Sequence, residues 1–191
     1  MGLFNRKKKE EPKAQANTNE SEFDRDVRAL LARDDIQCRE DVCEAEYTKA
    51  KGLLDNPTQE TVRRAYDIMG HLAAQFGYAP AMTWMGDFAE NVKKDLSEAV
   101  NWYKKAADLG DGNGARCYAD MLMAGVGVAR DPREAMKYYT VAANAGVPEA
   151  AFVLGEFFRT HGDRENALKA YRQALAGGYA PAQTRINQMN G

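Results

Sequence analysis

The side chains best suited to metal or nucleophilic chemistry are few and far apart in this sequence. His71 and His161 are separated by 90 positions, and neither has another candidate ligand at the spacing that a metal site requires. Cys38 and Cys43 are five positions apart, which is wider than the C-x-x-C spacing of most zinc and redox sites. A metal site with four ligands would require Cys117 and His71 to lie close to Cys38 and Cys43 in the folded protein. We therefore expect neither a bound metal nor a cofactor.

Acidic pairs and a glycine-containing turn are also poor candidates for catalysis. Asp34 with Asp35, and Asp24 with Asp26, lie at polar helix ends, where no apolar pocket would shift a carboxyl pKa for general acid or base work. The turn at 125–128 follows an expected helix and lacks the Lys and the Ser or Thr that end a phosphate-binding loop. The sequence thus predicts no catalytic residue, and we expect a protein that is not an enzyme.

Composition and charge narrow the classes of function. The 191 residues include 26 basic and 28 acidic residues, for a formal net charge of -2, so no overall positive field would attract nucleic acid. No run approaches the roughly 20 apolar residues that span a bilayer, and the start lacks the apolar run of a secretory signal. The three cysteines form an odd set. These features favour a soluble protein of the reducing cytoplasm over a disulfide framework.

The first 22 residues are too polar to fold on their own. They mix basic and acidic side chains and have almost no apolar residue after Phe4, so burial could not offset the entropy lost on ordering. We expect a disordered tail over residues 1–22. Met1 to Lys9 combine apolar residues with a basic cluster, which would allow at most a weak contact with an anionic membrane.

An amphipathic helix is expected next, over residues 23–41. Ser21 and Asp24 resemble a capping box. Apolar residues then recur at helical spacing, at Phe23, Val27, Leu30 and Leu31. Such a helix would cover the apolar end of a repeat stack, because the terminal units of a stack need a polar outer face.

Small residues recur with a nearly constant period through the rest of the chain. Alanines are spaced by 34, 35 and 32 positions, at Ala81, Ala115, Ala150 and Ala182. Glycines that suit helix ends are spaced by 33, 36 and 32 positions, at Gly77, Gly110, Gly146 and Gly178. A period of this length is typical of stacked helical hairpins.

Capping signals divide each period into two helices. An acidic residue followed three positions later by Glu or Asn opens the second helix at Asp95, Asp131 and Asp163. An alanine that would let the paired helices approach closely follows each of them, at Ala99, Ala135 and Ala167. In the preceding, weaker unit, Asn56 and Pro57 are expected to start a helix. Gln59 would complete its cap, and Gly77 would end it.

These residues resemble the Sel1-like repeat family, a branch of the tetratricopeptide-like helical hairpins. The unit opened by Ala81 shows the family pattern in Met85-Gly86, Asp95, Glu98-Ala99, Trp102-Tyr103, Lys105-Ala106-Ala107 and Gly110. The unit opened by Ala115 keeps Gly125-Val126-Gly127-Val128, Asp131, Glu134-Ala135, Tyr138-Tyr139, Ala142-Ala143 and Gly146, but has Ala119-Asp120 where Leu-Gly is usual. The unit opened by Ala150 keeps Leu154-Gly155, Ala167, Tyr171, Ala174 and Gly178.

The resemblance implies an all-α fold, an α-solenoid of stacked antiparallel helix hairpins that form an α/α superhelix. We expect this solenoid over residues 23–191. It would comprise the capping helix at 23–41, a degenerate repeat at 42–78, repeats at 79–112, 113–147 and 148–179, and a second capping helix at 180–191.

The resemblance also implies a protein-protein interaction adaptor or scaffold. We expect the protein to be a monomer or to self-associate weakly. First helices would line a concave groove that binds a peptide or helix of a partner protein. The candidate groove residues are Lys49, Leu53, Thr83, Asp87, Glu90, Cys117, Met121, Phe152, Glu156 and Arg159. Their mixture of apolar and acidic side chains favours a partner with apolar anchors and basic residues.

Two other functions stay open at this stage. The basic cluster would suit a membrane-peripheral regulatory protein that is anchored weakly through Met1 to Lys9. A metal or thiol switch is the other alternative, although Cys117 on a first helix suits a packing or groove-facing role better than a reactive one.

Overall fold

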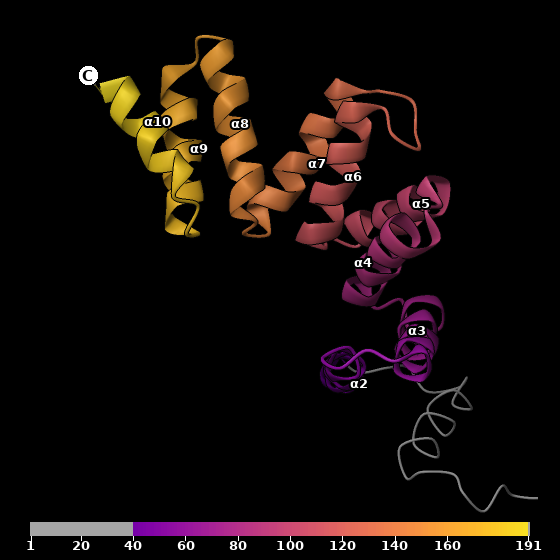
Figure 1. Ribbon diagram of the computed structural model, residues 1–191. Helices are drawn as coiled ribbons and strands as arrows, with labels where there is room; N and C mark the ends of the chain where they lie inside the picture. The colour runs from indigo at the N-terminus through magenta and orange to yellow at the C-terminus, as the bar shows by residue number, and fades with distance from the viewer. Residues whose placement is uncertain (1–39, 191) are drawn as a thin grey trace, which may run out of the picture. The chain divides into compact units, whose positions relative to one another are not determined.

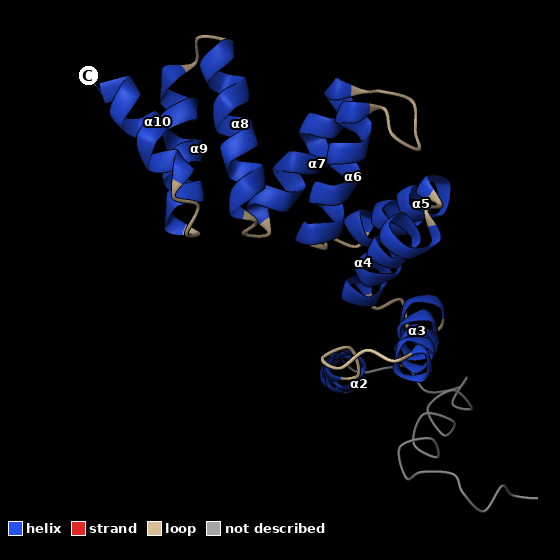
Figure 2. Cartoon of the chain, viewed as in Figure 1, coloured by secondary structure: helices blue, strands red, loops and turns tan. Residues whose placement is uncertain are grey.

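The computed structural model describes residues 40–190, and all regular secondary structure in this part of the chain is helical (Figures 1 and 2). The helices are α2 (Glu40–Gly52), α3 (Gln59–Ala74), α4 (Ala79–Phe88), the π-helical turn η1 (Ala89–Lys93), α5 (Leu96–Asp108), α6 (Gly112–Ala124), α7 (Pro132–Asn144), α8 (Pro148–Thr160), α9 (Arg164–Ala176) and α10 (Pro181–Asn190). The all-α prediction is confirmed. The tail at 1–22, the Ser21 cap and nearly all of the helix expected at 23–41 lie outside the described residues.

Each described helix packs against the next one along the chain, and α4 also contacts α6. The pairs α4 with α5, α6 with α7, and α8 with α9 are helical hairpins (Figure 1). The connection is η1 in the first pair, an extended loop over residues 125–131 in the second and a short turn over residues 161–163 in the third. Small residues make this packing close. Ala99, Ala135 and Ala167, which were expected to allow close approach of paired helices, are completely buried.

The predicted acidic caps of the second helices are confirmed. The side chain of Asp95 accepts a hydrogen bond from the backbone N–H of Glu98, and Asp163 does the same for Asn166. Asp131 accepts from two backbone N–H groups at the start of α7. These bonds satisfy donors that have no partner inside the helix.

The predicted start of α3 is wrong by two residues. Asn56 and Pro57 precede the helix, and Thr58 is its N-cap in an extended conformation. The Thr58 hydroxyl accepts from the N–H of Thr61 at 3.1 Å, and the Thr61 hydroxyl accepts from the N–H of Thr58 at 2.8 Å. This reciprocal pair satisfies two donors at once, so Gln59 is the first helical residue and not the capping partner.

The glycine landmarks adopt the backbone conformation expected of helix ends. Gly77, Gly110, Gly146 and Gly178 all have positive φ, between 65° and 93°, which costs glycine little because it has no side chain. However, α3 itself ends at Ala74. Gly77 therefore lies in the connection to α4 and is not the residue that ends the helix.

One cysteine differs from expectation. Cys43, on α2, is buried and disulfide-bonded, whereas Cys117 is a free thiol. The odd number of cysteines thus did not indicate the state of Cys43. An odd count shows only that at least one cysteine lacks a disulfide partner within the chain and does not say which one.

Candidate functional site

A buried tyrosine in the second helix of each hairpin donates a hydrogen bond to a carboxylate on the first helix. The pairs are Tyr103 with Asp87 (2.7 Å), Tyr139 with Asp120 (2.6 Å) and Tyr171 with Glu156 (2.7 Å). A buried phenol hydroxyl needs an acceptor, and acidic residues of the first helix supply it. The tyrosines therefore fix the positions of three carboxylates, two of which were predicted as groove residues.

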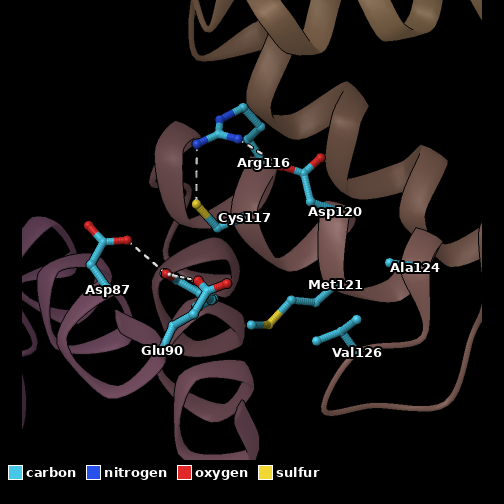
Figure 3. Close-up of a pocket in the computed structure, with 9 residues that line it drawn as sticks. Asp87, Glu90, Arg116, Cys117, Asp120, Met121, Ala124 and Val126 are labelled. Atoms are coloured by element: carbon cyan, nitrogen blue, oxygen red, sulfur yellow. Dashed lines mark hydrogen bonds and ion pairs between the residues drawn. The ribbon is translucent and has the colours of Figure 1, made fainter. Parts of the chain in front are cut away.

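The carboxylate that pairs with Tyr103 borders a pocket of about 370 Å³ (Figure 3). The residues that line it are Asp87, Glu90, Tyr103, Arg116, Cys117, Asp120, Met121, Ala124 and Val126. Helix α4 and the turn η1 contribute Asp87 and Glu90, and most of the other residues come from α6. The pocket is thus formed between the first helices of two successive hairpins.

Helical spacing explains why α6 contributes so many lining residues. Cys117 is followed by Asp120 and Met121 three and four positions later, and Ala124 comes four and three positions after those two, which places the four side chains on one face of a helix. Val126 follows in the turn after α6. In Figure 3 the Met121 and Val126 side chains lie together on the side of the pocket away from Arg116, so the pocket has an apolar part and a charged part.

Two carboxylates converge on the single hydroxyl group of Tyr103. The hydroxyl oxygen lies 2.7 Å from Asp87 Oδ1 and 2.9 Å from Glu90 Oε2. A tyrosine hydroxyl has one proton and can donate it to only one acceptor at a time. Burial raises the pKa of Asp87, and the nearby Glu90 charge raises it further, while the hydrogen bond from Tyr103 opposes the shift. The site therefore favours an additional proton or positive charge.

The one cation of the pocket is already engaged. Arg116 Nη1 lies 2.7 Å from Asp120 Oδ2, and Arg116 Nη2 lies 3.4 Å from Cys117 Sγ. Within residues 40–190, neither Asp87 nor Glu90 forms an ion pair. Three carboxylates and one guanidinium thus leave the pocket with an excess of acidic groups.

The Cys117 thiol is a poor nucleophile in this setting. Burial raises its pKa to about 11, although Arg116 opposes the shift, so almost none of the thiol is ionised at neutral pH. In the part of the chain that the structure describes, no group of three or more His, Cys, Asp or Glu side chains is arranged to hold a metal ion. No described helix is long and apolar enough to cross a bilayer.

The structure brings four of the ten predicted groove residues into this pocket, namely Asp87, Glu90, Cys117 and Met121. Thr83 instead is buried, and its hydroxyl donates to Asp111 Oδ1 at 2.7 Å. Because Asp111 also caps α6, Thr83 joins two successive hairpins and is not available to a partner. The prediction that the Thr83 side chain faces the groove is therefore wrong.

The other predicted residues lie elsewhere along the chain. Lys49 is exposed on α2 and pairs with Glu46 at 2.6 Å, and Leu53 lies in the turn after that helix. Phe152, Glu156 and Arg159 are on α8, where Glu156 accepts hydrogen bonds from both Arg159 and Arg185. None of these five residues lines the pocket.

Sequence reasoning missed five lining residues: Tyr103, Arg116, Asp120, Ala124 and Val126. Tyr103 was named only as part of the family pattern Trp102-Tyr103 and not as a groove residue. A signal for Asp120 was present, because it stands where the neighbouring units have Gly86 and Gly155. An acidic residue in place of a glycine faces the tyrosine of the second helix, and Tyr139 does donate to it.

The stacked hairpins define a helical-repeat protein, and comparison with known families gives its class. A model of the Sel1 repeat matches residues 72–111 and 117–147. These two segments are therefore Sel1 repeats, and the described chain has the helical-repeat fold of that family. Sel1 repeats generally mediate interactions between proteins.

Two curated proteins are similar to this chain over part of their length. An uncharacterized protein of Neisseria meningitidis is 32% identical over 119 residues, which are 60% of this chain and 25% of that protein. The chitin synthase regulator SKT5 of Saccharomyces cerevisiae is 33% identical over 130 residues, which are 62% of this chain and 18% of that protein. The chain thus spans a quarter or less of the length of these relatives.

A solved structure shows the same fold. It is that of c5321, described as a protective antigen of uropathogenic Escherichia coli strains with an SLR fold. The TM-score is 0.69 at 24% identity, with 85% of this chain and 36% of that chain covered.

Proposed function

We propose that this protein is a non-enzymatic adaptor or scaffold that binds a partner protein through the pocket between α4, η1 and α6. The observation that carries the proposal is the pair Asp87 and Glu90, two carboxylates that share one hydroxyl proton and form no ion pair within residues 40–190. A positively charged group from a partner would supply what the site lacks.

The pocket favours a Lys or Arg side chain as the part of the partner that enters it. The charged end would pair with Asp87 and Glu90, while the aliphatic stem would pack on Met121 and Val126, which line the same pocket. A volume of about 370 Å³ suits one side chain better than a whole helix. The similar yeast protein is named as a regulator of an enzyme, which accords with a role in binding and not in catalysis.

Affinity capture with a matched pair of variants tests the proposal. The full chain is used to capture proteins from its native lysate at near-physiological salt, and the retained proteins are identified by mass spectrometry. The test variant Asp87→Asn with Glu90→Gln removes two charges but leaves acceptors for the Tyr103 hydroxyl. The control variant Asp67→Asn with Glu165→Gln removes the same charge from exposed positions that do not line the pocket.

We expect a stoichiometric partner that is retained by the native chain and by the control variant and is lost by the pocket variant. Retention of every partner by the pocket variant at native levels would contradict the proposal. Neither variant should melt more than a few degrees below the native chain, so that loss of binding is not loss of folding.

A further inference from the structure

A second surface hollow, separate from the pocket at Asp87, lies between the first turns of α3 and the end of α4 with η1. Its volume is about 500 Å³. The residues that line it are Thr58, Gln59, Val62, Arg63, Tyr66, Phe88 and Lys93, and we call it the α3 groove. It shares no residue with the first pocket, so what binds there is a question beyond the function proposed above.

The wall of the α3 groove is mainly aromatic and aliphatic. The rings of Tyr66 and Phe88 have their centroids 4.9 Å apart, and Phe88 also stacks on Trp84 at 5.3 Å. Val62 lies one helical turn before Tyr66 on α3 and lines the same groove. All four side chains are only partly buried, so the described part of the chain leaves apolar area here for another molecule to cover.

The charged side chains that line the groove are both positive. Lys93 lies over the Tyr66 ring, with its Nζ 5.0 Å from the centroid, and its charge is balanced by Glu98 at 2.9 Å. Arg63 is exposed and forms no ion pair with any residue in 40–190. No carboxylate lines this groove. The groove also lies beside the N-terminus of α3, because Thr58 and Gln59 line it. The helix dipole favours negative charge there.

Helix α4 and the turn η1 together contribute residues of opposite charge to the two hollows. Helix α4 and η1 supply Asp87 and Glu90 to the first pocket and Phe88 and Lys93 to the α3 groove. One continuous helical segment thus has an acidic pocket on one side and an apolar groove with basic residues on another. A basic partner segment that suits the first pocket would be repelled by Arg63 at the second.

We propose that the α3 groove binds a segment of a partner protein in which an aromatic or branched apolar side chain stands next to carboxylates. The apolar side chain packs on Val62, Tyr66 and Phe88, and a neighbouring Glu or Asp pairs with Arg63. Charge complementarity selects this occupant. Arg63, which has no ion-pair partner within residues 40–190, and the N-terminus of α3 both favour an anion, while the apolar wall requires an apolar anchor beside it.

Two peptides of matched length test the proposal by NMR titration of the ¹⁵N-labelled full chain. The acidic probe is acetyl-Gly-Glu-Glu-Leu-Phe-Glu-Gly-amide, and the basic probe has Lys in place of each Glu. We expect the acidic probe to shift backbone amides in residues 58–66 and 88–93 and to bind about tenfold or more tightly than the basic probe at that site. Equal affinities, or shifts confined to other residues, would overturn the proposal.

Variants separate this groove from the first pocket. Arg63→Glu should weaken binding of the acidic probe by about fivefold or more, whereas Arg164→Glu, the same change at an exposed residue in the first turn of α9, should leave it unchanged. Asp87→Asn with Glu90→Gln should also leave the affinity for the acidic probe unchanged. The probe therefore tests the α3 groove whether or not the first pocket binds a partner. Unaltered binding in Arg63→Glu would overturn the proposal.

Discussion

Asp87 and Glu156 occupy equivalent places, since each accepts a hydrogen bond from the buried tyrosine of its hairpin, yet their surroundings shift their pKa values in opposite directions. Burial raises the pKa of Asp87 above its ordinary value of 3.8. Burial also acts to raise the pKa of Glu156, but hydrogen bonds from Arg159, Tyr171 and Arg185 outweigh it, and the pKa falls below 4.5. The two carboxylates should therefore contribute oppositely to the pH dependence of stability.

At Glu156 the stabilising contribution is present above pH 4.5 and is lost as the pH falls through the lowered folded pKa. Glu156→Gln should therefore lower the free energy of unfolding at neutral pH by about 1 kcal/mol. This loss should shrink as the pH falls below 4.5. Urea unfolding at several pH values measures it, and a loss that does not depend on pH would contradict the assigned pKa shift.

Asp87 should behave in the reverse sense. Because its folded pKa is raised, its contribution to stability is greatest below 3.8 and is lost as the pH rises through the folded pKa. Asp87→Asn should thus gain stability relative to the native chain as the pH rises toward neutrality, in the same urea experiment. If Asp87→Asn instead loses stability relative to the native chain as the pH rises, ionised Asp87 is favoured in the folded protein and the assigned direction of the pKa shift is contradicted.

Gly86 shows how closely the two helices of a hairpin approach. A Cβ atom built there would lie 2.5 Å from Cε1 of Tyr103, a side chain that is almost fully buried. Gly86→Ala should lower the free energy of unfolding by about 1 to 3 kcal/mol through overpacking. The matched control is Gly70→Ala on α3, where the nearest neighbour would be 3.9 Å away and helix propensity favours Ala by up to about 1 kcal/mol. Equal melting temperatures for the two variants would refute this packing.

At the scale of elements, the turn after α6 is held against the start of α5. Gly127 has φ of 69°, and a Cβ atom there would lie 2.6 Å from the backbone oxygen of Leu96. Gly162 has a similar φ of 79°, but a Cβ atom would meet nothing within 4 Å. The first glycine is thus needed for both conformation and close approach, and the second for conformation alone.

This difference predicts the relative cost of two substitutions. Gly162→Ala should cost about 1 to 2 kcal/mol, the usual penalty for a left-handed conformation in a residue with a side chain. Gly127→Ala should cost more, because Leu96 must also move. Chemical unfolding of both variants measures the two losses, and a smaller loss at Gly127 would contradict the described contact between the turn and α5.

Elements were more predictable than contacts between them. The cap at Asp95 and the burial of Ala99 follow from local spacing, because a cap and an alanine stripe act within one helix or one hairpin. The start of α3 was misplaced because Thr58 and Thr61 cap each other, and Pro57 is an equally plausible start by local rules. Thr83 could not be assigned from spacing alone, since its partner Asp111 is set by how helices pack. Asp120 was indicated by the repeat spacing, because it stands where the neighbouring units have glycine.

At the scale of the whole molecule, neighbouring hairpins form hollows that no single hairpin contains. The acidic pocket needs α4 with η1 from one hairpin and α6 from the next, and the α3 groove needs α3 with the end of α4 and η1. Two hollows of opposite charge would let one chain hold two different segments of partner proteins, which is the property an adaptor requires.

The most direct test of the adaptor function is the dissociation constant of the captured partner for the native chain, the Asp87→Asn with Glu90→Gln variant, and the Asp67→Asn with Glu165→Gln control. A pocket that pairs Asp87 and Glu90 with a partner cation predicts affinity at least about tenfold weaker in the pocket variant, or about 1.4 kcal/mol, and unchanged affinity in the control. Equal affinity in all three proteins would contradict the assignment of this pocket as the binding site.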